Sequence, residues 1–135
     1  MTSEAFRNDP LFLRNQFEGE GTFQIPIVKK QHISLEQLKF IGYDHIKSDE
    51  RENKDSVVHF FLDDYKFEVL WNHPEPRLEK LKQYKAVLTP QYSLYTEMPI
   101  TLQIYNTFRN RWVGAYLQSN GIAVIPTMCW GEPQS

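Results

Sequence analysis

Four acidic residues from position 63 onward could hold a divalent cation. Asp63 and Asp64 directly follow an apolar segment, and Glu97 and Glu132 lie close to the ends of later segments. Mg²⁺ and Mn²⁺ take several oxygen ligands at one point, so this set would suit a metal-dependent reaction on nucleic acid or a nucleotide. The structural alternative is that one aspartate accepts a backbone N–H in the turn 65–71 while the other is solvated. The sequence leaves both interpretations open.

A second set of residues suits binding to a macromolecule. Asn106, Arg109 and Asn110 recur at three- and four-residue spacing, which places them on one face of a helix where they could contact phosphates or base edges. Aromatic side chains in loops near strand ends can stack on bases or fill a partner's pocket. The structural alternatives are a solvated helix face and aromatics that close a small core. The candidate binding residues are Tyr92, Tyr95, Arg109, Arg111 and Trp130.

Other catalytic motifs are missing from the sequence. The four histidines lie thirteen or fourteen residues apart, whereas zinc motifs need spacings of about three to five, and His59 within an apolar strand suits a core residue. The single cysteine, Cys129, has no basic neighbour that would activate it as a nucleophile. There is no GxxxxGK[ST], GxGxxG or GxSxG sequence, so P-loop, dinucleotide and serine-hydrolase chemistry lack support.

Length and composition indicate one folded domain. The chain has 135 residues, of which 41% are hydrophobic and 14% aromatic, enough apolar surface for one core. Its net charge of −2 provides no overall basic field for nucleic acid, so such binding would need a local patch. One cysteine predicts a reducing compartment, and with no secretory or membrane-spanning segment we expect a cytoplasmic protein and no membrane partner.

Apolar segments and helical patterns alternate from residue 57 onward. Continuous apolar stretches predict buried strands near 57–62, 86–88 and 122–126. Amphipathic patterns between them predict helices over 74–84 and 99–119. This order predicts an α/β fold with a parallel β-α-β-α-β core, in a three-layer or half-barrel-like sheet.

The N-terminal half adds less regular segments. Residues 1–21 are expected to form an arm that leads into a single α/β domain over 22–135, with an extra strand region at its start. The segment 47–56 has seven charged residues in ten and predicts a solvated loop. Shorter patterns predict an edge strand or extended connection over Phe23–Val28, a helix over Ser34–Leu38 and a strand over Lys39–Ile46.

The last predicted strand has no helix after it, because the chain stops nine residues beyond Pro126. A parallel strand needs cover on both faces. We therefore expect this strand to be completed by an N-terminal element or by another chain, which includes association with a second copy.

Four segments together carry a resemblance to a known family: VHFFLDDYKFEVLW, KAVLTPQYSLYTEMP, QIYNTFRNRWVGAY and GIAVIPTMCW. In their order and spacing the chain resembles, from about Phe23 to Trp130, an uncharacterised bacterial, plasmid and phage family known as domain of unknown function 4417. The resemblance implies a phage or mobile-element origin and transfers no catalytic residue. Family members continue past this tryptophan, so the resemblance also implies that the C-terminal part of the family domain is missing here.

These observations favour a phage or mobile-element accessory domain that binds a macromolecule, most directly a host or phage protein, because the net charge is negative. On this interpretation the domain needs no cofactor. The alternative is a metal-dependent enzyme that acts on nucleic acid or a nucleotide, with Mg²⁺ or Mn²⁺ held by Asp63 and Asp64. Nucleic-acid binding through the arginines of the predicted helix stays open beside both.

Overall fold

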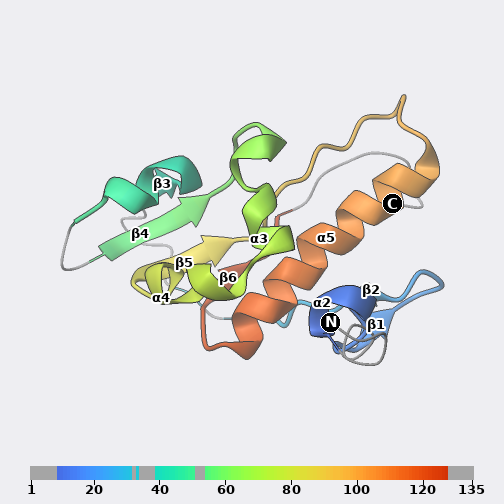
Figure 1. Cartoon of the computed structure of the whole chain (residues 1–135), viewed down its shortest axis with the longest axis horizontal. Helices are drawn as coiled ribbons and strands as arrows, with labels where there is room; N and C mark the ends of the chain where they lie inside the picture. The colour runs from blue at the N-terminus through green and yellow to red at the C-terminus, as the bar shows by residue number, and fades with distance from the viewer. Residues whose placement is uncertain (1–8, 32, 34–38, 51–53, 128–135) are drawn as a thin grey trace.

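The computed structural model describes residues 9–31, 33, 39–50 and 54–127 (Figure 1). The predicted helix over 34–38 lies outside these residues. In chain order the elements are α2 Pro10–Leu13, β1 Gly19–Glu20, β2 Ile25–Pro26, β3 Lys39–Gly42, η1 Tyr43–Ser48, β4 Lys54–His59, η2 Asp64–Lys66, α3 Glu68–Asn72, η3 Glu75–Arg77, α4 Leu78–Leu81, β5 Tyr84–Leu88, α5 Ile100–Ser119 and β6 Val124–Ile125.

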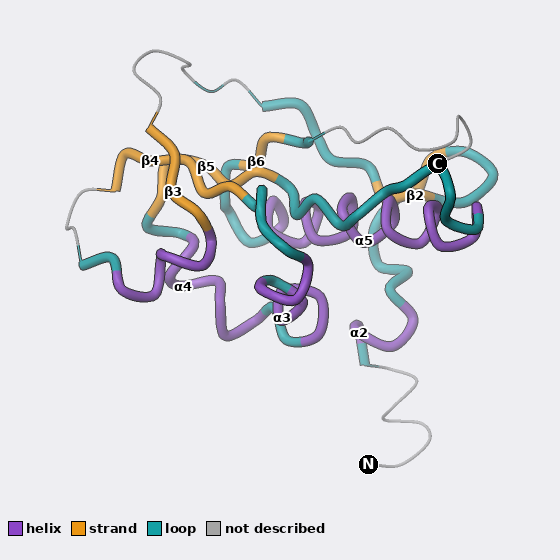
Figure 2. Tube along the Cα trace, turned by 90° about the horizontal axis from the view of Figure 1, so that it is seen from above, coloured by secondary structure: helices purple, strands orange, loops and turns teal. Residues whose placement is uncertain are grey.

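Four parallel strands form the main sheet in the order β3-β4-β5-β6. Neighbours in the sheet are also neighbours along the chain, so successive right-handed crossovers bring their helices to the same face. Figure 2 shows α3, α4 and α5 on one side of the strands. The predicted α/β class with parallel pairing is confirmed, and α3, α4 and α5 lie on one side of the sheet rather than on both sides as in a three-layer arrangement.

Strand β4 begins and ends three residues earlier than its apolar pattern predicts. Phe60 leaves the sheet and packs edge-on against Phe67, with ring centroids 5.4 Å apart, while Phe61 is exposed. At the other end, the expectation that 47–56 is wholly a solvated loop is wrong, because Lys54–Ser56 belongs to β4 and Ser56 is buried. Backbone pairing with β3 and β5 orders this polar end of the strand.

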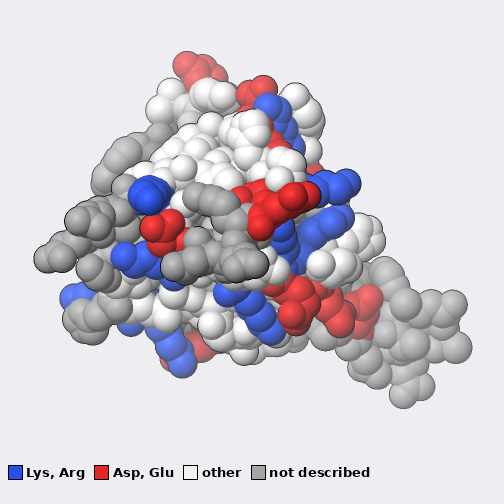
Figure 3. All heavy atoms as spheres, turned by 90° about the vertical axis from the view of Figure 1, so that its left-hand side faces the viewer, with Lys and Arg blue, Asp and Glu red and all other residues white. Residues whose placement is uncertain are grey.

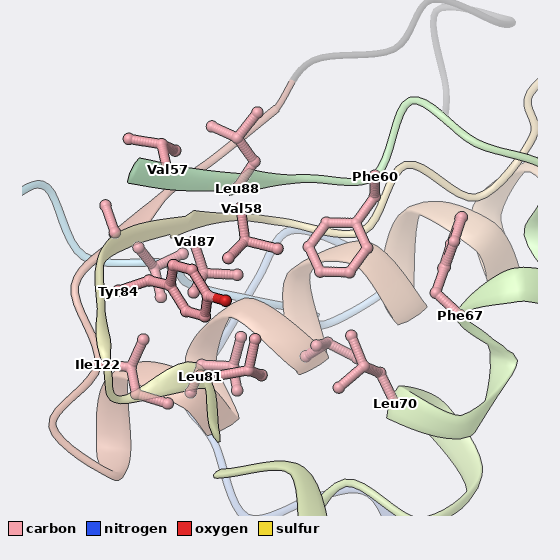
Figure 4. Packing of buried hydrophobic residues seen from close by; sticks show 14 of the residues in the cluster. Val57, Val58, Phe60, Phe67, Leu70, Leu81, Tyr84, Val87, Leu88 and Ile122 are labelled. Atoms are coloured by element: carbon pink, nitrogen blue, oxygen red, sulfur yellow. The ribbon is translucent and has the colours of Figure 1, made fainter. Parts of the chain in front are cut away.

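The core lies on both faces of the central strands. Val57 and Val58 are fully buried, although they point to opposite sides of β4, as Figure 4 shows. Leu88 lies on the same side as Val57, and Phe60 on the side of Val58. The continuous apolar sequence of β4 therefore does predict a strand buried on both faces.

The N-terminal segment packs on α5 rather than joining the main sheet. β1 and β2 pair antiparallel in a hairpin of their own, which accounts for the predicted extra strand region (Figure 1). The Gln118 side chain of α5 then accepts from Lys29 N at 2.8 Å and donates to Lys29 O at 2.7 Å. These paired bonds fix the chain where it leaves the hairpin.

Helix α5 approaches the sheet most closely at Gly114. A Cβ added there would lie 2.6 Å from Thr89 Cγ2 and 2.8 Å from Val28 Cγ2. Both neighbours are β-branched, so their methyl groups cannot turn aside freely. Glycine at this position allows the helix, the end of β5 and the segment after the hairpin to meet.

Gly114→Ala is expected to lower the free energy of unfolding by about 1 kcal/mol, because overpacking outweighs the gain in helix propensity. Urea denaturation followed by circular dichroism measures this change. The control is Ser119→Ala, an exposed position of the same helix, which should change stability by less than about 0.5 kcal/mol. A stabilised Gly114→Ala variant would contradict the close packing described here.

Candidate functional site

The carboxyl ends of the four parallel strands face the same side of the molecule. The arrows of β4 and β5 point to the side where the loops after them emerge (Figure 1). Ligand and partner sites of parallel α/β sheets lie at this side, in the loops that follow the strands. Most of the predicted site residues belong to these two loops or to α5, which packs beneath them.

Residues 89–99 form a segment without regular secondary structure that α5 holds in place. Three amide side chains on one stripe of the helix donate hydrogen bonds to backbone carbonyls of this segment. The pairs are Gln103 to Met98 at 2.9 Å, Asn106 to Ser93 at 2.7 Å and Asn110 to Pro90 at 2.8 Å. These bonds satisfy backbone carbonyls that have no partner in a strand or a helix. The side chains of α5 therefore hold the segment in place.

Asp64 joins this segment to the loop after β4. Its two carboxylate oxygens accept from Ser93 N at 3.1 Å and Ser93 Oγ at 3.0 Å. Of the two roles expected for the aspartate pair, one is found: Asp63 is exposed to solvent and makes no side-chain cap. Asp64 does not accept from the turn 65–71 but from Ser93, 29 residues along the chain. We call this contact the Asp64–Ser93 clasp.

Arg109 is buried in an internal polar cluster. Its guanidinium donates to both Glu68 oxygens at 2.9 Å and to Asn106 Oδ1 at 2.7 Å, and it lies 3.9 Å from the ring centroid of Tyr92. Arg109 is 8% exposed and Tyr92 is 1% exposed. The expectation that these two residues lie on the surface is therefore wrong, because the polar stripe of α5 faces inward.

The Tyr92 hydroxyl has no hydrogen-bond partner among the residues described. Burial raises the pKa of Tyr92 well above its usual range, and the nearby Arg109 opposes part of that rise. Tyr92 is therefore neutral at physiological pH. Its ring contacts both Arg109 and the core residue Phe67, with a Phe67–Tyr92 centroid distance of 5.2 Å.

Three aromatic side chains remain exposed on the two loops that the clasp joins. Phe61 is 63% exposed, Tyr65 74% and Tyr95 61%. Tyr65 directly follows Asp64, and Tyr95 lies two residues after Ser93, so the clasp brings their backbones together. We call Phe61, Tyr65 and Tyr95 the aromatic rim.

Arg111 lies at the carboxyl ends of β5 and β6 and is half-buried. It donates to Asn110 Oδ1 at 3.1 Å, and Asn110 in turn donates to Thr127 Oγ1 at 3.0 Å. Thr127 N donates to Thr89 Oγ1 at 2.7 Å, which ties the ends of the two strands together. Burial lowers the pKa of Arg111, and in contrast to Arg109 it forms no ion pair within the described residues.

The structure does not gather the predicted metal ligands. Asp63 and Glu97 are exposed and both oxygens of Asp64 are held by Ser93, while Glu132 lies outside the described residues, as does Trp130. Within the described ranges, no three His, Cys, Asp or Glu side chains form a group that could hold a metal ion. Each oxygen of Asp64 already accepts one hydrogen bond in the clasp, so Asp64 has fewer free lone pairs for a cation than a solvated carboxylate has.

Charges are mixed on the face that Figure 3 shows. Among the described residues on this face, lysine and arginine lie interspersed with aspartate and glutamate and form no continuous basic surface. Phosphate backbones are bound by clustered positive charge, which this face does not offer. Among the described helices, none is both long and apolar enough to cross a membrane.

Comparison with known proteins links the chain to phages. It is 42% identical over 127 residues to the Gene 1 protein of Mycobacterium phage L5, a match that covers 94% of this chain and 55% of that protein. It is 49% identical over 79 residues to the Gene 1 protein of Mycobacterium phage D29, covering 58% of this chain and 29% of that protein. The chain thus spans about half or less of each of these relatives. No solved structure matches.

A family model described as a domain of unknown function matches residues 17–135. The match begins in the β1–β2 hairpin region and includes all four strands of the main sheet, α5 and both loops that carry the aromatic rim. The resemblance found from the four sequence segments is confirmed. The chain belongs to the family of domain of unknown function 4417.

Proposed function

We propose that this chain is a phage accessory domain that binds a host protein through the aromatic rim. The observation that carries the proposal is the exposure of Phe61, Tyr65 and Tyr95, each above 60%, on two loops that the Asp64–Ser93 clasp joins. Tyrosine and phenylalanine bury large areas on binding, and tyrosine is enriched at positions that dominate binding energy. Such residues on fixed loops lose little conformational freedom when a partner binds.

The charge distribution favours a protein partner over nucleic acid. The net charge is −2, and the guanidinium of Arg109 is engaged by Glu68 inside the fold. Arg111 is half-buried and so offers less to a phosphate backbone than a surface arginine would. The described part of α5 therefore supplies little of the electrostatic contact that drives nucleic-acid binding.

The metal-dependent enzyme is the rival proposal, and no specific geometry favours it. A cation site would use Asp63 and Asp64, but the clasp occupies the oxygens of Asp64. Calorimetric titration of the protein with Mg²⁺ and Mn²⁺ measures this directly. If the binding proposal is correct, the titration should give no saturable heat of metal binding. A saturable heat in the wild type that Asp63→Ala abolishes would favour the enzyme.

The Tyr65→Ala/Tyr95→Ala variant is expected to lose partner binding. At interface positions that dominate the energy each truncation costs about 2 kcal/mol or more, so the double variant should bind at least about 100-fold more weakly. The measurement is affinity capture from a lysate of a Mycobacterium strain, chosen because the two phage relatives infect that genus. Mass spectrometry identifies the captured protein, and surface plasmon resonance then gives its Kd.

The matched control is Phe23→Ala, because Phe23 is 49% exposed and lies on the β1–β2 hairpin loop rather than on either loop that the clasp joins. This variant should retain full affinity for the protein that the wild type binds. If Phe23→Ala loses the partner while the double tyrosine variant keeps it, binding uses another surface and the proposal is wrong.

A further inference from the structure

A cavity of about 500 Å³ opens between the β1–β2 hairpin, α5 and the end of β6. Its wall is mainly apolar, from Ile25, Val28 and Pro126. Arg111 and Glu20 supply the charged groups of the lining. The cavity therefore combines an apolar body with one cation and one carboxylate.

Among the residues that line this cavity, Arg111 carries a positive charge that has no ion-pair partner within the described residues. A desolvated guanidinium is costly unless a carboxylate or another acceptor compensates it. Arg109 has Glu68 for this purpose, whereas the hydrogen bond to the Asn110 amide oxygen is the only compensation that the described residues give Arg111. Glu20 lines the same cavity but is exposed and forms no ion pair with Arg111.

The guanidinium is also held in position. Asn110, which accepts from Arg111, is itself fixed by its bonds to Pro90 O and Thr127 Oγ1. Through these bonds Arg111 is tied to the carboxyl ends of β5 and β6, the side of a parallel sheet where ligands bind. A fixed cation that has no ion-pair partner among the described residues and lies beside an apolar cavity is the arrangement of a site for an organic anion.

We propose that this cavity binds a carboxylate attached to an apolar group, with the carboxylate on Arg111 and the apolar part against Ile25, Val28 and Pro126. A guanidinium donates two parallel hydrogen bonds to a carboxylate, which would supply the missing compensation. Glu20 disfavours a dianion such as phosphate in the same space, so a single negative charge fits best. The site is distinct from the aromatic rim and does not depend on the proposed function.

The test is a titration of the full chain with hexanoate, followed by NMR on the Arg111 side-chain Nε–Hε and the Val28 backbone N–H signals. Hexanol probes the apolar group without the charge. Inorganic phosphate probes the negative charge without the apolar group. We expect saturable shifts of both signals with hexanoate, in the millimolar range, and at least tenfold weaker binding of hexanol and phosphate. Glu20→Gln should strengthen phosphate binding.

Arg111→Met keeps the length and apolar stem of the side chain and removes the charge. It should weaken hexanoate binding at least tenfold, because the cation that would pair with the carboxylate is removed. Arg77→Met, at an exposed arginine of η3, is the matched control and should bind hexanoate as the wild type does.

Three results would overturn the proposal: no saturable shift in the wild type, equal binding of hexanol and hexanoate, or undiminished hexanoate binding by Arg111→Met. The aromatic rim plays no part in this titration. The expected hexanoate binding therefore stays the same even if no host protein binds the rim.

Discussion

Trp112→Ala is expected to lower the free energy of unfolding by about 3–5 kcal/mol. Trp112 is fully buried in α5 and contacts three aromatic rings from three segments, at centroid distances of 5.7 Å to Phe17, 5.5 Å to Trp71 and 5.1 Å to Tyr116. The guanidinium of Arg14 lies 4.3 Å from its ring. Truncation would leave a cavity where the N-terminal segment, α3 and α5 meet.

The measurement is urea denaturation monitored by circular dichroism, with Leu102→Ala as the control. Leu102 lies on the same helix and is 47% exposed, so its truncation should cost about 1 kcal/mol or less. If the two variants lost equal amounts of unfolding free energy, this result would contradict the burial of Trp112 among the aromatic rings of the N-terminal segment, α3 and α5.

Arg109→Met is expected to lower the free energy of unfolding by about 3 kcal/mol, because it breaks a buried, hydrogen-bonded charge pair. The change would leave Glu68 without its partner and Asn106 Oδ1 without its donor. Glu68 is 37% exposed, so solvent would compensate part of the loss. The same denaturation experiment measures it.

A double-mutant cycle with Glu68→Gln separates the ion pair from the rest of the Arg109 contacts. The Arg109→Met/Glu68→Gln variant should be more stable than the sum of the single losses predicts, by about 1–2 kcal/mol. Additive losses would show that the two side chains do not interact in solution and would contradict the internal cluster.

The sequence predicts the main architecture because its signals are local. Pro99 precedes α5 and Gly121, with a φ of +83°, follows its end, so the helix is found almost at its predicted bounds. The apolar stretch in β4 and the helices between strands are enough to predict parallel pairing. The ends of β4 could not be predicted in the same way, because they depend on Phe60 and Phe67 meeting and on backbone pairing with β3 and β5.

The candidate site was harder to predict because its contacts link distant parts of the chain. Asp64 bonds to Ser93 29 residues away, and Arg109 to Glu68 41 residues away. The stripe of Gln103, Asn106 and Asn110 has the spacing of a solvated helix face but faces inward. One signal could have revealed it: the segment 89–99 has no regular structure, so its carbonyls need side-chain donors.

Site-specific photo-crosslinking tests the central claim, that a protein partner binds the aromatic rim, most directly. A benzophenone amino acid placed at Tyr95 should form one specific adduct with a host protein in cells that make this domain, and the same residue placed at Phe23 should not. An adduct of that protein from Phe23 and none from Tyr95 would contradict the account.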